Sequence, residues 1–305
     1  MQITLAQTAA VAGLGLHTGR PARVVLRPAP VGHGIAFRRV DLPGRPVIPA
    51  LWDRVEPGPL ATRLVAGAAS VSTVEHLMAA LSGAGVANAL VECDGPEAPI
   101  LDGSSLPWLR AILGAGLVAE DAPRLAWAVR EAVEARAGDA VARLEPLPGR
   151  FEMDFLIDFP APAIGRQRLR LDMANGAFAR ELSDCRTFCL RGDVEAMRAR
   201  GLALGGTLEN AVVVEGDRVL SPGGLRRPDE AVRHKMLDAL GDLALAGGPI
   251  LGRYVGERAG HSLTNALLRA AFARGGALAP VACDTRLLAR LPGAGLMAAD
   301  LPAVA

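Results

Sequence analysis

The sequence predicts an α+β protein built from two related units. Helical and strand-like patterns mix along the 305 residues without the regular strand–helix–strand rhythm of a doubly wound parallel sheet. Segment 22–30 (ARVVLRPAP) has a similar outline to segment 140–149 (AVARLEPLPG). A chain of this length usually forms about two domains. We therefore expect the units to meet near residues 121–124, which gives domains over 1–122 and 123–305.

The first unit is expected to open with two strands joined by a turn. Alternating residues favour strands over 3–11 and 22–26, and GLGLHTG lies between them at 13–19. Its glycines do not have the spacing of a dinucleotide-binding loop, and no helical pattern follows. We therefore predict a hairpin turn here, not a phosphate-binding loop.

Apolar residues spaced three and four apart predict the helices. The first unit has such patterns over 73–84 and 106–114, and the second over 193–201 and 229–246. The last of these ends at a Gly-Gly pair, a typical helix stop. The remaining strands are expected over 87–93, 125–135, 140–144, 151–159, 211–214 and 250–257.

The composition excludes several classes of protein. Lys and Arg total 33 against 32 Asp and Glu, so the net charge of +1 would not attract nucleic acid. Hydrophobic residues make up 50% of the chain, which excludes an extended disordered protein. The apolar stretches fall short of the roughly 20 residues of a membrane span, and no signal peptide is apparent. We expect a cytoplasmic globular monomer with at most transient association with a membrane surface.

The four cysteines are Cys93, Cys185, Cys189 and Cys283. They are too few for a disulfide framework in a chain of this length, and no CxxC motif is present. Cys185 and Cys189 are four residues apart, but no second pair completes a metal site. We interpret all four as small core residues.

The helix predicted over 229–246 carries polar groups on one face. His234 and Asp238 are one turn apart, and Asp242 follows one turn later. The opposite side is apolar: Val232, Met236, Ala239, Leu240 and Leu243. A histidine and a carboxylate at this spacing can supply two zinc ligands. The same spacing also occurs as an exposed pair that stabilises a helix slightly, and the pattern alone leaves both interpretations open.

A second candidate segment is STVEHL at 72–77. Ser72 and Glu75 have the spacing of a capping box, so Glu75 could simply close the first helical turn. His76 could instead complete a set of three protein ligands, which leaves the fourth position on zinc for water. Glu75 would then be a suitable general base. This segment alone does not decide between a helix-capping role and a metal site.

Lys235 is the only lysine in the chain, and it lies between His234 and Asp238. Because Arg and Lys are not interchangeable at compact charge sites, its position indicates an ammonium suited to a tetrahedral oxyanion; the alternative is chance. His261 is expected in a Gly-flanked loop, RAGHSLTN. A histidine there could be structural or could protonate a leaving amine, and Asp242 could orient it and raise its pKa.

With these residues assembled, the chain resembles the zinc-dependent UDP-3-O-acyl-N-acetylglucosamine deacetylases of lipid A biosynthesis. The matching stretches run from near residue 10 to near residue 270: GLGLHTGRPARVVLRPAP, STVEHLMAAL, PEAPILDGSSLPW, CRTFCLRGDVEAMRARGLALGG, RHKMLDALGDLALAG and GHSLTNALL. The resemblance implies two similar α+β domains, each a small, mainly antiparallel sheet with helices. It also implies that their helix layers pack face to face around the active site.

The resemblance implies a metal centre and a base. His76, His234 and Asp238 match the zinc ligands of the family, and Glu75 matches the general base that activates the attacking water. One catalytic zinc ion is implied, although iron(II) would accept the same ligands.

Further residues match groups around that centre. His261 matches the general acid that protonates the departing amine, and Asp242 matches the carboxylate paired with it. Lys235 and Thr187 match side chains placed around the oxyanion. Asp102 matches a further carboxylate, for which we expect a structural or supporting role.

The resemblance also implies an apolar passage for the acyl chain of the substrate. The matching residues are Phe188, Leu190, Val194, Leu202 and Ala203, which could equally be ordinary core residues. Leu190 stands where an aromatic is often found, so an acyl-length preference does not transfer. The uridine diphosphate contacts of the family include lysines, and here arginines must take that role.

The resemblance therefore predicts hydrolysis of the acetamide of UDP-3-O-acyl-N-acetylglucosamine, a committed step of lipid A biosynthesis. The expected partner is this small UDP-acyl-sugar, with no nucleic acid. One alternative is a zinc amidohydrolase that acts on another N-acyl sugar on the same scaffold. The other is a non-catalytic sugar-nucleotide-binding protein with a structural His–Asp helix.

Overall fold

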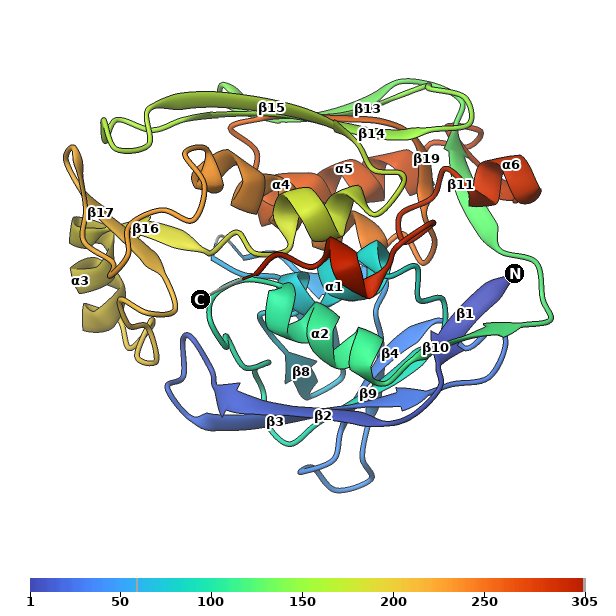
Figure 1. Cartoon of the computed structure of the whole chain (residues 1–305), viewed down its shortest axis with the longest axis horizontal. Helices are drawn as coiled ribbons and strands as arrows, with labels where there is room; N and C mark the ends of the chain where they lie inside the picture. The colour runs from blue at the N-terminus through green and yellow to red at the C-terminus, as the bar shows by residue number, and fades with distance from the viewer. Residues whose placement is uncertain (59, 304–305) are drawn as a thin grey trace.

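The computed structural model describes residues 1–58 and 60–303. Sheets form its two outer layers, and helices lie between them (Figure 1). The fold is mixed α+β, as predicted. Most strand pairs are antiparallel, and the parallel ones are β4–β9, β11–β19, β14–β19 and β16–β17.

The first half of the chain builds one outer layer. Its five-stranded sheet has the order β2 (Ala9–Leu14), β3 (Pro21–Pro28), β9 (Ala89–Cys93), β4 (Ile35–Arg39) and β5 (Val47–Pro49). Smaller sheets pair β6 (Val55–Glu56), β7 (Arg63–Ala66) and β8 (Ala69–Val71), and β1 (Gln2–Leu5) with β10 (Leu117–Glu120). Helices α1 (Glu75–Gly83) and α2 (Leu106–Gly114) cover the inner side, and the turn η1 is Trp52–Arg54 (Figure 1).

The second half builds the other outer layer. Its central strand β19 (Ile250–Glu257) pairs with β11 (Leu125–Val129), β13 (Ala140–Glu145) and β14 (Phe151–Asp158). Strands β12 (Val133–Ala137), β15 (Arg166–Asp172) and β20 (Leu278–Ala282) extend this sheet. Helices α4 (Glu230–Ala244) and α5 (His261–Ala273) lie on its inner side (Figure 1). The other helical segments are the π-turn Phe178–Leu182, α6 (Thr285–Leu288) and the turn η3 (Ala298–Asp300).

A small separate unit projects from the second half. It contains β16 (Phe188–Leu190), α3 (Arg191–Ala199), β17 (Val212–Glu215) and β18 (Arg218–Val219), at the left of Figure 1. The three strands form one sheet in the order β16-β17-β18.

The predicted domain boundary agrees with the strand pairing. Within the described residues, every strand pair lies either before residue 121 or after residue 124, because β10 pairs with β1 and β11 pairs with β19 and β20. The division into 1–122 and 123–305 stays a prediction that this pairing supports.

Two of the long predicted strands are each divided into two strands in the structure. The segment predicted over 3–11 divides into β1 and β2, because the chain changes partner from β10 to β3 between them. The segment predicted over 125–135 divides into β11 and β12, which pair with different strands in the same way. Alternation predicted the strands correctly, but it contains no information on where the pairing partner changes.

The other predicted elements lie close to those observed. The GLGLHTG segment is the β2–β3 hairpin connection, and α4 lies inside the predicted helix 229–246. Cys93 and Cys185 are buried, whereas Cys189 and Cys283 are partly buried, and all four are free thiols. Within residues 1–58 and 60–303, no helix has the length and apolar character that crossing a membrane requires.

Helices α1 and α4 pack closely at the centre of the molecule. Gly241 of α4 lies against the backbone of Glu75 in α1, so closely that a Cβ atom there would collide with the Glu75 carbonyl group. The buried residues Leu77 and Met78 of α1 and Leu237 and Leu240 of α4 belong to the same apolar core. This contact brings residues from the two halves of the chain together.

Candidate metal centre and active site

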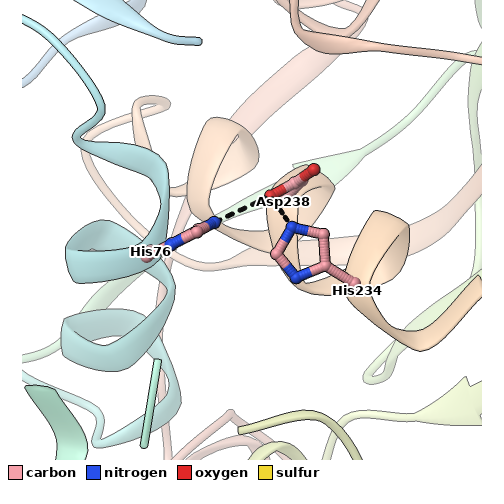
Figure 2. Close-up of side chains that lie close together, drawn as sticks. All are labelled: His76, His234 and Asp238. Atoms are coloured by element: carbon pink, nitrogen blue, oxygen red, sulfur yellow. Dashed lines mark ion pairs between the residues drawn. The ribbon is translucent and has the colours of Figure 1, made fainter. Parts of the chain in front are cut away.

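Three buried side chains converge between α1 and α4. His76 comes from the first turn of α1, and His234 and Asp238 lie one turn apart on α4 (Figure 2). One potential ligand atom from each lies within 4.8 Å of the others. The Nε2 atoms of His76 and His234 lie 3.5 and 3.3 Å from the same oxygen, Oδ1 of Asp238. The alternative of an exposed His–Asp pair on this helix is therefore wrong.

The contacts within this cluster suit a bound cation. Asp238 Oδ1 is buried and has no hydrogen-bond partner among the described residues, although two imidazoles face it. His234 Nδ1 lies 3.0 Å from the carbonyl oxygen of Cys185, to which it donates, so its Nε2 keeps a lone pair. Two imidazole nitrogens and one carboxylate form a ligand set of catalytic zinc sites. The residues present therefore fit a zinc ion.

Glu75 lies beside this cluster and is buried. Helix α1 begins at this residue without a side-chain cap, so the predicted capping box with Ser72 is not formed. Glu75 Oε2 instead accepts a hydrogen bond of 3.0 Å from the backbone N–H of Thr62. Burial raises the pKa of the Glu75 carboxyl, and the nearby His261 and His76 oppose that shift. A buried carboxyl with a raised pKa is a candidate proton acceptor.

His261 was expected in a loop, but it is the first residue of α5. Its Nδ1 donates to Asp242 Oδ2 at 2.8 Å, and its Nε2 lies 4.0 Å from Glu75 Oε1. Burial disfavours the charged imidazole, but Asp242 outweighs it and raises the pKa of His261 to about 9. This contact agrees with the sequence-based suggestion that Asp242 orients His261 and raises its pKa.

Thr62 is a member of this network that the sequence did not reveal. Its hydroxyl donates to Asp242 Oδ1 at 2.5 Å and lies 3.3 Å from His261 Nδ1, while its backbone N–H binds Glu75. It stands in an unremarkable segment, PLATRL, 13 residues before Glu75 and 180 before Asp242. No spacing rule connects residues so far apart.

Lys235 also reaches the cluster. Its Nζ donates to Asp238 Oδ2 at 2.8 Å, the oxygen that does not face the two histidines. Burial disfavours the charged ammonium, but Asp238 outweighs it and raises the pKa of Lys235. The side chain is therefore a fixed positive charge at the edge of the cluster.

A large pocket of about 980 Å³ opens onto these groups. Besides Glu75, His76, His234, Lys235, Asp238 and His261, it is lined by Thr187 and by the unit that contains β16, α3 and β17. Phe188, Leu190, Val194 and Ala203 line it as well, whereas Leu202 is not among its lining residues. Four of the five residues suggested for an acyl passage thus face one cavity.

Two further polar residues lie near this pocket. His17 lines it, and both of its ring nitrogens are buried without a hydrogen-bond partner in the described part of the chain. Asp102 does not line it: its Oδ2 accepts hydrogen bonds of 3.0 Å from Arg226, and its Oδ1 accepts two from Ser104. These contacts are those of a supporting residue.

Comparison with known proteins agrees with this geometry. The model of the UDP-3-O-acyl N-acetylglycosamine deacetylase family matches residues 2–273. A protein of Phenylobacterium zucineum named UDP-3-O-acyl-N-acetylglucosamine deacetylase is 50% identical over 277 residues, which cover 90% of this chain and 94% of that protein.

Other relatives carry the same name. One from Anaeromyxobacter sp. (strain Fw109-5) is 47% identical over 89% of this chain and 88% of its own length. One from Myxococcus xanthus is 48% identical over 88% of this chain and 85% of its own. The resemblance inferred from the motifs is thus confirmed over most of the sequence. The chain belongs to the UDP-3-O-acyl N-acetylglycosamine deacetylase family.

Proposed function

We propose that this protein hydrolyses the N-acetyl group of UDP-3-O-acyl-N-acetylglucosamine to give acetate and the free amine, a step of lipid A biosynthesis. The observation that carries the proposal is the convergence of His76, His234 and Asp238 beside Glu75 and His261, in the lining of a large pocket. Hydrolysis of an amide is helped by a proton acceptor for the attacking water and a proton donor for the leaving nitrogen, and Glu75 and His261 can supply these two roles beside the cluster.

His76, His234 and Asp238 would hold a zinc ion. When bound, the ion supplies Lewis acidity that polarises the acetamide carbonyl and lowers the pKa of water. Iron(II) would accept the same donor atoms, so the experiment must compare the two metals.

The protein side chains then move the protons. Glu75 accepts a proton from the attacking water molecule as the water oxygen bonds to the carbonyl carbon. Lys235 and Thr187 donate hydrogen bonds to the oxyanion that develops. His261 keeps its proton because Asp242 accepts from Nδ1, and it gives the proton at Nε2 to the nitrogen as the C–N bond breaks. Water is consumed, and acetate and the amine leave.

The pocket supports the substrate class. A cavity of about 980 Å³ is far larger than an acetyl group, and Phe188, Leu190, Val194 and Ala203 give part of it an apolar lining. We propose that this part receives the 3-O-acyl chain. We also propose that the protein works in the cytoplasm as a monomer, which cell fractionation and sedimentation analysis test.

The decisive experiment measures acetate release from UDP-3-O-acyl-N-acetylglucosamine by chelator-treated protein, before and after one equivalent of zinc or iron(II). Activity that vanishes and returns supports the proposal. A matched panel in which the nucleotide or the acyl chain is removed distinguishes it from an amidohydrolase of other N-acyl sugars. Turnover that is independent of metal would contradict it.

A further inference from the structure

Thr62 contacts both sides of the proton-transfer machinery. It is buried and lies directly before β7 in the first half of the chain. Its backbone N–H donates to Glu75 Oε2 at 3.0 Å, and its hydroxyl donates to Asp242 Oδ1 at 2.5 Å. The same hydroxyl oxygen lies 3.3 Å from His261 Nδ1. A single residue therefore touches the candidate base and the pair that contains the candidate acid.

The backbone of Thr62 is fixed against the start of α1. Its carbonyl oxygen accepts a hydrogen bond of 3.4 Å from the N–H of Val74, and its own N–H binds the side chain of the next residue, Glu75. On the other side, Arg63 begins β7, which pairs with β6 and β8. These contacts use main-chain atoms, so they persist when only the side chain of Thr62 is changed. A substitution of Thr62 thus tests the hydroxyl by itself.

The hydroxyl of Thr62 completes the partners of the Asp242 carboxylate. Asp242 is buried; its Oδ1 accepts from Thr62, and its Oδ2 accepts from His261 Nδ1 at 2.8 Å. The terminal torsion of an aspartate has a broad energy minimum, so rotamer preference alone does not fix the plane of this carboxylate. Donors on both of its oxygens do fix it. Because Asp242 orients the ring of His261, the hydroxyl sets where the Nε2 proton points.

We propose, on the basis of the deacetylase function proposed above, that Thr62 is a positioning residue for both proton transfers. Its main chain holds Glu75, and its hydroxyl holds Asp242 and thereby the imidazole of His261. Thr62 is not among the described residues that line the large pocket, whereas Glu75 and His261 are. It therefore acts through these groups and not on the substrate. A buried hydroxyl with a purely structural role would contribute to stability, but its removal would leave turnover unchanged.

The test compares Thr62→Val, which keeps the shape of the side chain without the hydroxyl, with Thr62→Ser, which keeps the hydroxyl. In Thr62→Val we expect kcat for acetate release to fall at least about tenfold at unchanged zinc content, because a misplacement of about 1 Å can cost about a hundredfold. KM should stay near the wild-type value, and Thr62→Ser should keep most of the activity. Thr62→Ala removes the same hydroxyl and should reproduce the loss if Thr62→Val folds poorly.

Thr264→Val is the matched control. Thr264 is also buried, and its hydroxyl lies 2.9 Å from the hydroxyl of Tyr254. It is in α5, three residues after His261, and it is not among the described lining residues of the large pocket. This variant loses a buried hydrogen bond close to the site without touching Asp242, so kcat should stay near the wild-type value.

A second readout needs neither substrate nor metal. In chelated protein, the proton on His261 Nδ1 is expected as a slowly exchanging NMR resonance, assigned by its absence from His261→Gln. It should persist in Thr62→Ser and Thr264→Val. In Thr62→Val it should be lost to exchange with solvent, because the Asp242 carboxylate no longer has a donor on Oδ1.

Three results would overturn the positioning role: full kcat in Thr62→Val, an equal loss of kcat in Thr264→Val, or a loss in Thr62→Ser as large as in Thr62→Val. An unchanged His261 resonance in Thr62→Val would overturn it as well. Absence of acetate release by the wild-type protein would instead contradict the proposed function, and the resonance would still decide whether the hydroxyl of Thr62 holds the Asp242–His261 pair.

Discussion

The candidate metal centre depends on a few polar atoms that have no other partner. Asp238 uses Oδ2 to bind Lys235 and leaves Oδ1 facing two imidazoles without a hydrogen bond. An unsatisfied buried polar atom costs free energy, and a cation held by the three side chains would remove that cost. Glu75 and His261 lie just outside these three side chains. Glu75 accepts a hydrogen bond from the backbone N–H of Thr62, and His261 donates one to Asp242.

Glu75→Gln is expected to reduce kcat by about a hundredfold or more, because general-base catalysis contributes at least that much. The amide keeps the shape of the side chain but cannot accept the proton of water. Steady-state acetate release measures the loss, and metal analysis should show unchanged zinc content.

The control for this variant is Ser72→Ala. Its hydroxyl binds the Pro96 carbonyl group and not the helix, so activity should stay near wild type. A loss of less than about tenfold in Glu75→Gln or Glu75→Ala would contradict the role of Glu75 as the base.

The pH profile of kcat/KM should be bell-shaped. Activity requires ionised Glu75 and protonated His261, so it rises with pH through the pKa of Glu75 and falls through that of His261, at about 9. Asp242→Asn removes the charge that raises the pKa of His261, and burial then lowers it. The alkaline limb should therefore move to lower pH by about one unit or more. An alkaline limb that stays in place would show that His261 is not the acid.

At the scale of elements, the contact between α1 and α4 sets the geometry of the site. Gly241 of α4 meets the backbone carbonyl of Glu75, the residue before the candidate ligand His76. A backbone atom cannot move aside as a flexible side chain does. The two helices therefore approach each other closely beside the candidate active site, where Glu75 and His76 must face His234 and Asp238.

Gly241→Ala is expected to destabilise the protein by about 1–3 kcal/mol, because overpacking exceeds the gain of up to about 1 kcal/mol from helix propensity. It should also weaken zinc binding, since α1 must move away from α4. Urea unfolding and zinc titration measure the two effects. Gly192→Ala is the control: Gly192 lies in α3 with open space around its Cβ position, so this change should be neutral or stabilising.

The sequence predicted local elements better than their partners. The helix over 229–246 and the strand over 250–257 were close to α4 and β19, because an apolar stripe and a Gly-Gly stop are local signals. The segment 3–11 was wrong as one strand, since the change of partner depends on residues more than a hundred positions away. Helix α5 was missed because glycine-flanked His261 follows a strand without a cap signal.

The candidate site likewise contains residues that local motifs suggest and residues that only the fold brings together. Its three candidate metal ligands and Glu75 belong to short motifs that a single chain displays, so the sequence alone can suggest them. Thr62 contacts Asp242 across 180 positions, and only the fold brings them together. The mutual distances of His76, His234 and Asp238 could likewise not be predicted from the sequence, because they depend on how α1 packs against α4.

At the scale of the whole molecule, the candidate metal centre joins the two halves of the chain. His76 comes from the first half, and His234 and Asp238 come from the second, with no strand pair between the halves among the described residues. A metal ion that binds all three would act as a further cross-link between two layers that also meet through apolar helix packing and through hydrogen bonds such as that from Thr62 to Asp242.

Zinc is therefore expected to stabilise the whole fold and not only the site. Because zinc binds the three ligands together only in the folded chain, free zinc at a thousand times its Kd adds about 4 kcal/mol to the free energy of unfolding. Calorimetry of chelated and zinc-loaded protein measures this as a rise in Tm. His76→Ala and His234→Ala should each abolish the rise, because the cross-link needs ligands from both helices. His33→Ala, which removes an exposed histidine, should retain it. A rise that persists in His76→Ala would mean that the second half binds the metal alone, and the cross-link between the halves would then be wrong.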